Sequence, residues 1–171
     1  MSEDDDEGLE KVLVALPNHW ATGGESIWAK PLGKDEYELR NSPFYAYGLN
    51  WGDIVLAISA EPDLKPLVRK VVRPSGNRTL RVFFGDNLSR ESQNEYLDGL
   101  KDLGLSYERA TGHLVALDVE ANGDYDAICD ELWKLEKEGV LQYETCEARA
   151  EGRFDDGPEV DDEIEGHEYE N

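Results

Sequence analysis

The chain has 171 residues, of which 39 are acidic and 17 are basic, so its formal net charge at pH 7 is −22. This charge repels nucleic acid and anionic membranes and favours basic protein surfaces as partners. The sequence has no run of 18 apolar residues and no basic, apolar start, so it predicts neither a membrane span nor a signal peptide. Its two cysteines are expected to be small buried residues that remain as free thiols in a reducing compartment. We therefore expect a cytoplasmic protein.

The acidic residues gather at both ends. Six lie within residues 1–10 and ten within 151–171, which leaves 23 acids and 16 bases in residues 11–150. High charge with little apolar content is typical of disorder. We expect a disordered acidic N-terminus (1–10), a folded body, and a disordered acidic tail (151–171).

Short apolar segments separated by turn residues fill residues 11–78, which predicts a curled antiparallel β-sheet or small barrel. The segments 26–32 and 37–40 flank a four-residue loop and predict a hairpin. Pro74-Ser75-Gly76-Asn77 is strong turn chemistry, so the segments on either side of it predict a second hairpin. The predicted strands are 11–16, 26–32, 37–40, 53–59, 67–72 and 79–84.

The pattern changes after residue 84. Ser89 and Asp124 can cap helices over 89–103 and 124–138, which have apolar residues at helical spacing. Together with strand 79–84, the order becomes β-α-β-β-α-β, which is that of a ferredoxin-like half over residues 79–150. The predicted class is α+β. The remaining predicted strands are 105–111, 113–119 and 141–148.

No motif for catalysis, metal or cofactor stands out. His19, His113 and His167 lack the H-E-x-x-H spacing and any nearby cysteine ligand pair. The sequence also has no G-x-S-x-G and no glycine-rich phosphate loop. We predict no enzyme activity, no cofactor and no metal site; a small hydrolase or transferase that uses His19 or His113 is the weaker alternative.

Basic residues concentrate in segment 64–84, which contains no acid. A basic β-ribbon can follow nucleic-acid phosphates, so one hypothesis is a nucleic-acid-linked regulator that uses the hairpin Arg69–Arg81. Two plainer interpretations are pairing with surrounding acids and docking of the acidic tail within the same molecule. The hairpin residues in question are Arg69, Lys70, Arg73, Arg78 and Arg81.

Aromatic residues gather between Arg40 and Asp53. Tyr, Trp and Arg are the usual anchors of protein interfaces, so Arg40, Tyr45, Tyr47 and Trp51 are candidate contacts. The alternative is that aromatic residues of this segment plug one end of the barrel.

Three stretches carry a resemblance: ESIWA (25–29), RNSPFYAYGLNWGD (40–53), and GLSY (104–107) with HLVALDV (113–119). They resemble a family of small bacterial proteins with an uncharacterised domain, over about residues 12–147. That resemblance implies no catalytic residues. The layout is also similar to the acidic protein inhibitor of ribonuclease E, which has an aromatic-acid pair like Tyr143-Glu144.

The leading hypothesis is a non-catalytic acidic protein that docks on or neutralises a basic protein partner, as an immunity protein or inhibitor does. Carboxylates would steer the encounter and aromatic residues would anchor it. The acidic ends could instead serve solubility alone. The acidic candidate contacts are Asp155, Asp156, Asp161, Asp162 and Glu163.

Overall fold

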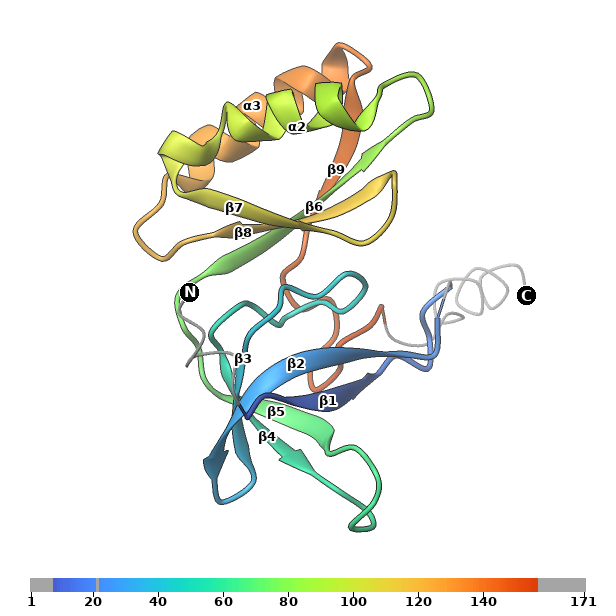
Figure 1. The fold of residues 1–171 in the computed structure, drawn as a ribbon, viewed down its shortest axis with the longest axis vertical. Helices are drawn as coiled ribbons and strands as arrows, with labels where there is room; N and C mark the ends of the chain where they lie inside the picture. Colours follow the sequence, from blue (N-terminus) through green and yellow to red (C-terminus); the bar gives the residue numbers. More distant parts are fainter. Residues whose placement is uncertain (1–7, 21, 157–171) are drawn as a thin grey trace, which may run out of the picture.

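We analysed a computed structural model that describes residues 8–20 and 22–156. The protein is of the α+β class: a closed β-barrel and a four-stranded sheet lie one above the other, and two helices cover the far face of the sheet (Figure 1). None of these helices has both the length and the apolar character that a membrane crossing requires.

The first half, predicted to be a curled antiparallel sheet or a small barrel, is a closed barrel of five strands. Each strand pairs antiparallel with the next. Because an odd number of such strands leaves the first and the last running the same way, the barrel closes through a parallel contact between Leu13 and Leu67. The strands are β1 (Glu10–Ala15), β2 (Gly24–Gly33), β3 (Glu36–Leu39), β4 (Ile54–Ile58) and β5 (Leu67–Arg73).

Small and branched apolar side chains fill the barrel, among them Val12, Val14, Ile27 and Leu39. Phe154, from the other end of the chain, is partly buried and packs against this core. Residues 151–156, predicted to belong to a disordered tail, therefore pack against the barrel, and Asp155 is fully buried. Glu10, predicted to lie in the disordered N-terminus, begins β1.

The second half contains β6 (Arg78–Phe84), α2 (Arg90–Asp98), the 3-10 turn η1 (Lys101–Leu103), β7 (Leu105–Arg109), β8 (Leu114–Val119), α3 (Tyr125–Lys137) and β9 (Leu141–Thr145). The sheet is antiparallel with the order β7-β8-β6-β9. Ser89 and Asp124 cap the helices, as predicted, by accepting hydrogen bonds from the backbone N–H groups of Ser92 and Ala127.

The two faces of this sheet differ in chemistry. On β6, the apolar Leu80, Val82 and Phe84 belong to the core under the helices. The intervening Thr79 and Arg81 lie on the opposite face and bond to the 40–53 loop of the barrel half. The sheet thus rests on the barrel through polar side chains.

The predicted second hairpin is wrong. β5 pairs with β1 and β4 in the barrel, whereas β6 is a central strand of the second sheet. The turn at residues 74–77 is the connection between the halves, where the Ser75 N–H donates to the buried carboxylate of Asp53 (2.9 Å). Turn residues identify a reversal of the chain, but they do not specify which strands pair across it.

Candidate functional site

The loop between β3 and β4 joins the two halves. Its backbone is shaped by Glu25 of β2, whose carboxylate accepts hydrogen bonds from the N–H groups of Phe44 (2.9 Å), Tyr45 (3.0 Å) and Ala46 (2.7 Å). Glu25 was not among the predicted site residues. Its only sequence signal was its place at the start of the ESIWA stretch.

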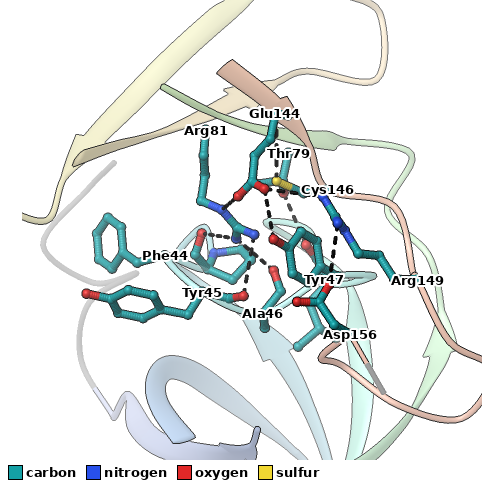
Figure 2. A network of polar contacts seen from close by, with 12 residues as sticks. Phe44, Tyr45, Ala46, Tyr47, Thr79, Arg81, Glu144, Cys146, Arg149 and Asp156 are labelled. Carbon is teal, nitrogen blue, oxygen red and sulfur yellow. Dashed lines mark hydrogen bonds and ion pairs between the residues drawn. The ribbon is translucent and has the colours of Figure 1, made fainter. Parts of the chain in front are cut away.

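Arg81 lies at the centre of the contact between the halves (Figure 2). Only 2% of its side chain is exposed. Its guanidinium donates to Glu144 of β9 (2.9 Å) and to the backbone carbonyls of Ala46 (2.7 Å) and Pro43 (3.3 Å). Arg81 therefore ties two strands of the sheet to the barrel loop, and it is not available to contact phosphates as the basic-hairpin hypothesis required.

Tyr47 completes this network. Its hydroxyl donates to Glu144 (2.8 Å), and its ring lies under the guanidinium groups of Arg81 (4.6 Å) and Arg149 (4.2 Å). Burial and the bond to Glu144 raise the pKa of Tyr47 to about 12. With 5% of its surface exposed, Tyr47 is a structural residue and not the rim anchor that the sequence suggested.

The resemblance motif of the 40–53 loop has structural explanations. The Asn41 amide accepts from the Trp28 N–H and donates to Glu108 (2.8 and 3.0 Å). Gly48 has a φ of +80° and lies so close to Ala148 that an added Cβ would stand 3.0 Å from the Ala148 Cβ. Asp53 accepts from Asn50 and Ser75. The motif thus holds the two halves together.

An open groove of about 580 Å³ lies between the halves beside this network. Trp20, 87% exposed, and Phe83, 49% exposed, are its most accessible aromatic side chains. The rings of Phe44 and Tyr45 also line it and point away from the Arg81 network (Figure 2). The groove is mostly apolar, and Arg81 and Glu144 in its lining are already bonded to each other.

His19 and His113 contact aromatic rings and backbone groups. His19 stacks on Trp20 and meets Tyr45 edge-on, and its Nδ1 accepts from the Thr22 N–H (3.3 Å). His113 lies beside Asp86 (3.2 Å) and the Phe84 carbonyl. No group of His, Cys, Asp or Glu within residues 8–20 and 22–156 is arranged to hold a metal ion. His167 lies outside the described residues.

A second pocket, of about 310 Å³, lies where the Trp51 loop meets the edge of the sheet. Three of its lining residues are acidic: Glu108, Asp118 and Glu120. Asp118 is only 8% exposed, and its carboxylate accepts from the Asn77 amide (3.1 Å). Trp51 and Tyr107 also line this pocket, which we call the acidic pocket.

The acidic pocket places carboxylates close together without a cation. Burial, and then repulsion from Glu120 and Glu108, raise the pKa of Asp118 to about 6. Burial also raises the pKa of Glu108. No Lys or Arg of the described residues forms an ion pair with Glu108, Asp118 or Glu120. A cation that entered the pocket would favour the charged forms of these carboxylates.

The remaining predicted contacts are dispersed. Arg40 is largely buried, pairs with Glu38 (3.7 Å) and lies over the Trp51 ring. Arg78 is exposed but pairs with Glu147 (2.7 Å). Asp156 is exposed and pairs with Arg149 (3.4 Å), whereas Asp155 accepts from the Asn18 N–H (2.8 Å). The predicted contacts Asp161, Asp162 and Glu163 lie outside the described residues.

Comparison with known proteins fits this architecture. A hypothetical protein from Neisseria gonorrhoeae has a similar crystal structure, with a TM-score of 0.67 over 81% of this chain and 95% of that one, at 13% identity. At that identity the likeness concerns the fold alone. A search of curated proteins found no match. The family described as "Domain of unknown function (DUF4265)" matches residues 25–143. The chain therefore belongs to this family, whose matched segment runs from Glu25 of the barrel to Tyr143 of the last strand.

Proposed function

We propose that the protein is a non-catalytic acidic binding protein that docks on a basic protein partner through its second half, in the manner of an immunity protein or inhibitor. One observation carries the proposal. Residues 8–73 hold eight acids and eight bases, and residues 151–156, beside the barrel, add three acids and one base, whereas residues 74–150 hold 16 acids and eight bases. Most of the net negative charge of the described chain therefore lies on the sheet-and-helix half.

Much of this charge lies on the helix layer. Residues 89–103 and 124–138 together contain ten acids and four bases, and they cover the face of the sheet that points away from the barrel. A negatively charged surface accelerates the encounter with a positively charged one. This acceleration decreases as the ionic strength rises. The helix layer would supply this steering.

The acidic pocket would supply the anchor. Interface energy concentrates in a few residues, commonly Trp, Tyr and Arg. A lysine or arginine side chain of the partner would lie against Trp51 and Tyr107 and meet the carboxylates of Glu108, Asp118 and Glu120. This arrangement would pair carboxylates that lack a cation in the described chain.

The test compares two variants that each remove one negative charge, one in the acidic pocket and one on the helix layer. Binding of an arginine- and lysine-rich peptide is measured in solution by calorimetry at low salt for Glu120→Gln and for Glu91→Gln on α2. The proposal expects about a tenfold weaker binding for the pocket variant, equivalent to about 1.4 kcal/mol, and a much smaller loss for the helix variant. Trp51→Ala should weaken binding as well.

Two results would count against the proposal. Equal effects of Glu120→Gln and Glu91→Gln would mean that the peptide responds to net charge alone. Failure to recover a stoichiometric protein partner from the native cell lysate at low salt would argue that the charge serves solubility.

A nucleic-acid-linked regulator remains the second candidate, because Arg69, Lys70 and Arg73 are exposed on β5. Its surface would be β5 alone, since Arg81 is buried and β6 belongs to the other sheet. Salt-sensitive binding of a single-stranded RNA oligonucleotide that Lys70→Glu abolishes would support it. Absence of binding by the full chain and by its tail-neutralised form would remove it.

We also assign the second half to the ferredoxin-like class. Its elements follow the order strand-helix-strand-strand-helix-strand, and β6 lies between β8 and β9. This arrangement puts both helices on one face and leaves the opposite, polar face to the barrel. The class hosts many unrelated functions, so it supports the architecture and not the partner.

A further inference from the structure

Strand β5 exposes its basic side chains to solvent because the alternation of inward- and outward-facing residues along it is interrupted twice. Register shifts occur where β5 pairs with Ile54/Val55 and with Leu56/Ala57 of β4. A bulge adds one residue to a strand and turns the following side chains to the other face. As a result Arg69 and Lys70 are both exposed, and so are Val72 and Arg73. We call Arg69, Lys70 and Arg73 the β5 basic strip.

The strip has no carboxylate partner in the part of the chain that the structure describes. Every ion pair found there involves other cations, including Arg149 and Arg153 near the C-terminal end. Among residues 8–20 and 22–156, therefore, three neighbouring bases on a strand with two bulges have no ion-pair partner. A carboxylate partner from the same chain would have to come from outside these residues.

The C-terminal end of the described chain comes back to this strand. After β9 the chain leaves the sheet and runs down to the barrel (Figure 1). Residues Gly152–Asp155 and Leu67–Arg69 line one shallow pocket of about 250 Å³. Asp155 fixes this position through its bond with the Asn18 N–H (2.8 Å). Residue 157 therefore follows a segment that is anchored beside the start of β5.

The sequence beyond that point complements the strip. Residues 157–171 contain seven acids and neither lysine nor arginine. Fifteen extended residues reach about 50 Å, whereas the seven residues of β5 span about 23 Å. The segment is therefore long enough to lie along the whole strand. Its acids are Glu159, Asp161, Asp162, Glu163, Glu165, Glu168 and Glu170.

We propose that the acidic segment 157–171 docks on the β5 basic strip of its own molecule. A short tether gives an effective concentration in the millimolar range, so weak exposed ion pairs suffice to fill the site. Docking closes the strip to other polyanions, and a basic partner that takes the tail uncovers it. The proposal does not depend on the docking of a partner at the acidic pocket.

Carbodiimide cross-linking of the full chain tests the proposal, because this reagent joins an amine to a carboxylate in direct contact. Mass spectrometry should find Lys70 joined to residues 159–170 at least about fivefold more often than the exposed Lys34 or Lys137, and raising the salt to 0.5 M should remove the excess. Mixing light and isotope-labelled protein should show that the links form within one molecule. Lys70→Arg keeps the charge and should abolish this cross-link.

NMR spectroscopy provides a second measurement that does not depend on the efficiency of cross-linking. In the full chain, Asp161→Asn/Asp162→Asn/Glu163→Gln should shift the NMR amide signals of Arg69–Arg73 and leave those of α3 unchanged. The proposal is overturned if Lys70 reacts no more than Lys34 and Lys137 and the β5 amides do not move, or if the links are intermolecular. Peptide binding at the acidic pocket is a separate readout, so either proposal can fail without the other.

Discussion

The barrel half and the sheet-and-helix half belong to one chain but differ in net charge and in where their charged side chains lie. Residues 8–73 of the barrel half balance eight acids with eight bases, whereas residues 74–150 carry eight more acids than bases. The two meet through Arg81, Glu144, Asn41 and Glu108, which are bonded across the junction. The contrast indicates that paired charges fix the geometry of the junction around Arg81, while unpaired carboxylates lie on the helix layer and in the acidic pocket at the edge of the junction.

The largest expected effect comes from Arg81, which joins the two halves. Arg81→Met removes every guanidinium bond and leaves Glu144 and the carbonyls of Pro43, Tyr45 and Ala46 short of a donor. Because Glu144 is half-buried and keeps its bonds to Tyr47 and Arg149, we expect the free energy of unfolding to fall by about 3 kcal/mol, measured by urea denaturation. Arg78→Met, which removes an exposed pair with Glu147, should cost about 1 kcal/mol or less. Similar losses for both variants would contradict a junction based on Arg81.

Substitution of Glu25 tests whether this barrel residue fixes the conformation of the 40–53 loop, against which the sheet packs. Glu25→Gln replaces one accepting oxygen by a donor, so at least one of the N–H groups of Phe44, Tyr45 and Ala46 loses its partner. We expect a loss of about 2 kcal/mol and faster hydrogen exchange at these three amides. The exposed Glu95→Gln on α2 is the matched control and should change neither quantity.

The acidic pocket gives a pH test. A carboxyl whose folded pKa of about 6 lies above its unfolded value binds protons more tightly when folded. Its contribution to stability is therefore greatest at low pH and is lost as the pH rises from about 4 to 6. Asp118→Asn should flatten this part of the stability curve and stabilise the protein at pH 7–8 by on the order of 1 kcal/mol after solvent screening. The same slope in both proteins would contradict the raised pKa.

Surface charges give the smallest effect. On the crowded helix layer, Glu138→Gln at the C-terminal end of α3 should stabilise the fold by a few tenths of a kcal/mol at low salt, because it relieves repulsion from other acids and from the negative end of the helix dipole. The same change at Glu61, in the balanced barrel half, should be neutral. Thermal unfolding at two salt concentrations measures both. The difference should vanish in 0.5 M salt, and its persistence would show that the charge contrast is not its cause.

Most element positions could be predicted from the sequence. Apolar alternation located β4 and β9, and capping residues located the starts of α2 and α3 within one residue. These signals are local. The predicted four-residue loop at 33–36 is instead a turn in which Lys34 and Asp35 adopt φ values near +60°, and these residue types do not signal such a turn. Gly99 ends α2 earlier than the apolar spacing suggested.

The site was less predictable, since its contacts join residues far apart in sequence. Glu25 reaches the 44–46 loop, and Tyr47 on that loop donates to Glu144 of β9. Composition marked Arg81 as a surface base, but its position on the polar face of a central strand buries it. Trp51 was found as an aromatic candidate, whereas its acidic neighbours Glu108 on β7, Asp118 on β8 and Glu120 directly after β8 were not identified from the sequence.

The packing of Phe154 against the barrel core has a consequence for biosynthesis. A ribosome completes the five barrel strands at Arg73, yet Phe154, which packs against their core, emerges 81 positions later. At ordinary elongation rates this delay is about 4 to 16 s. During that interval the apolar residues that Phe154 covers stay exposed, so truncation before Phe154 should make the nascent polypeptide more prone to aggregate.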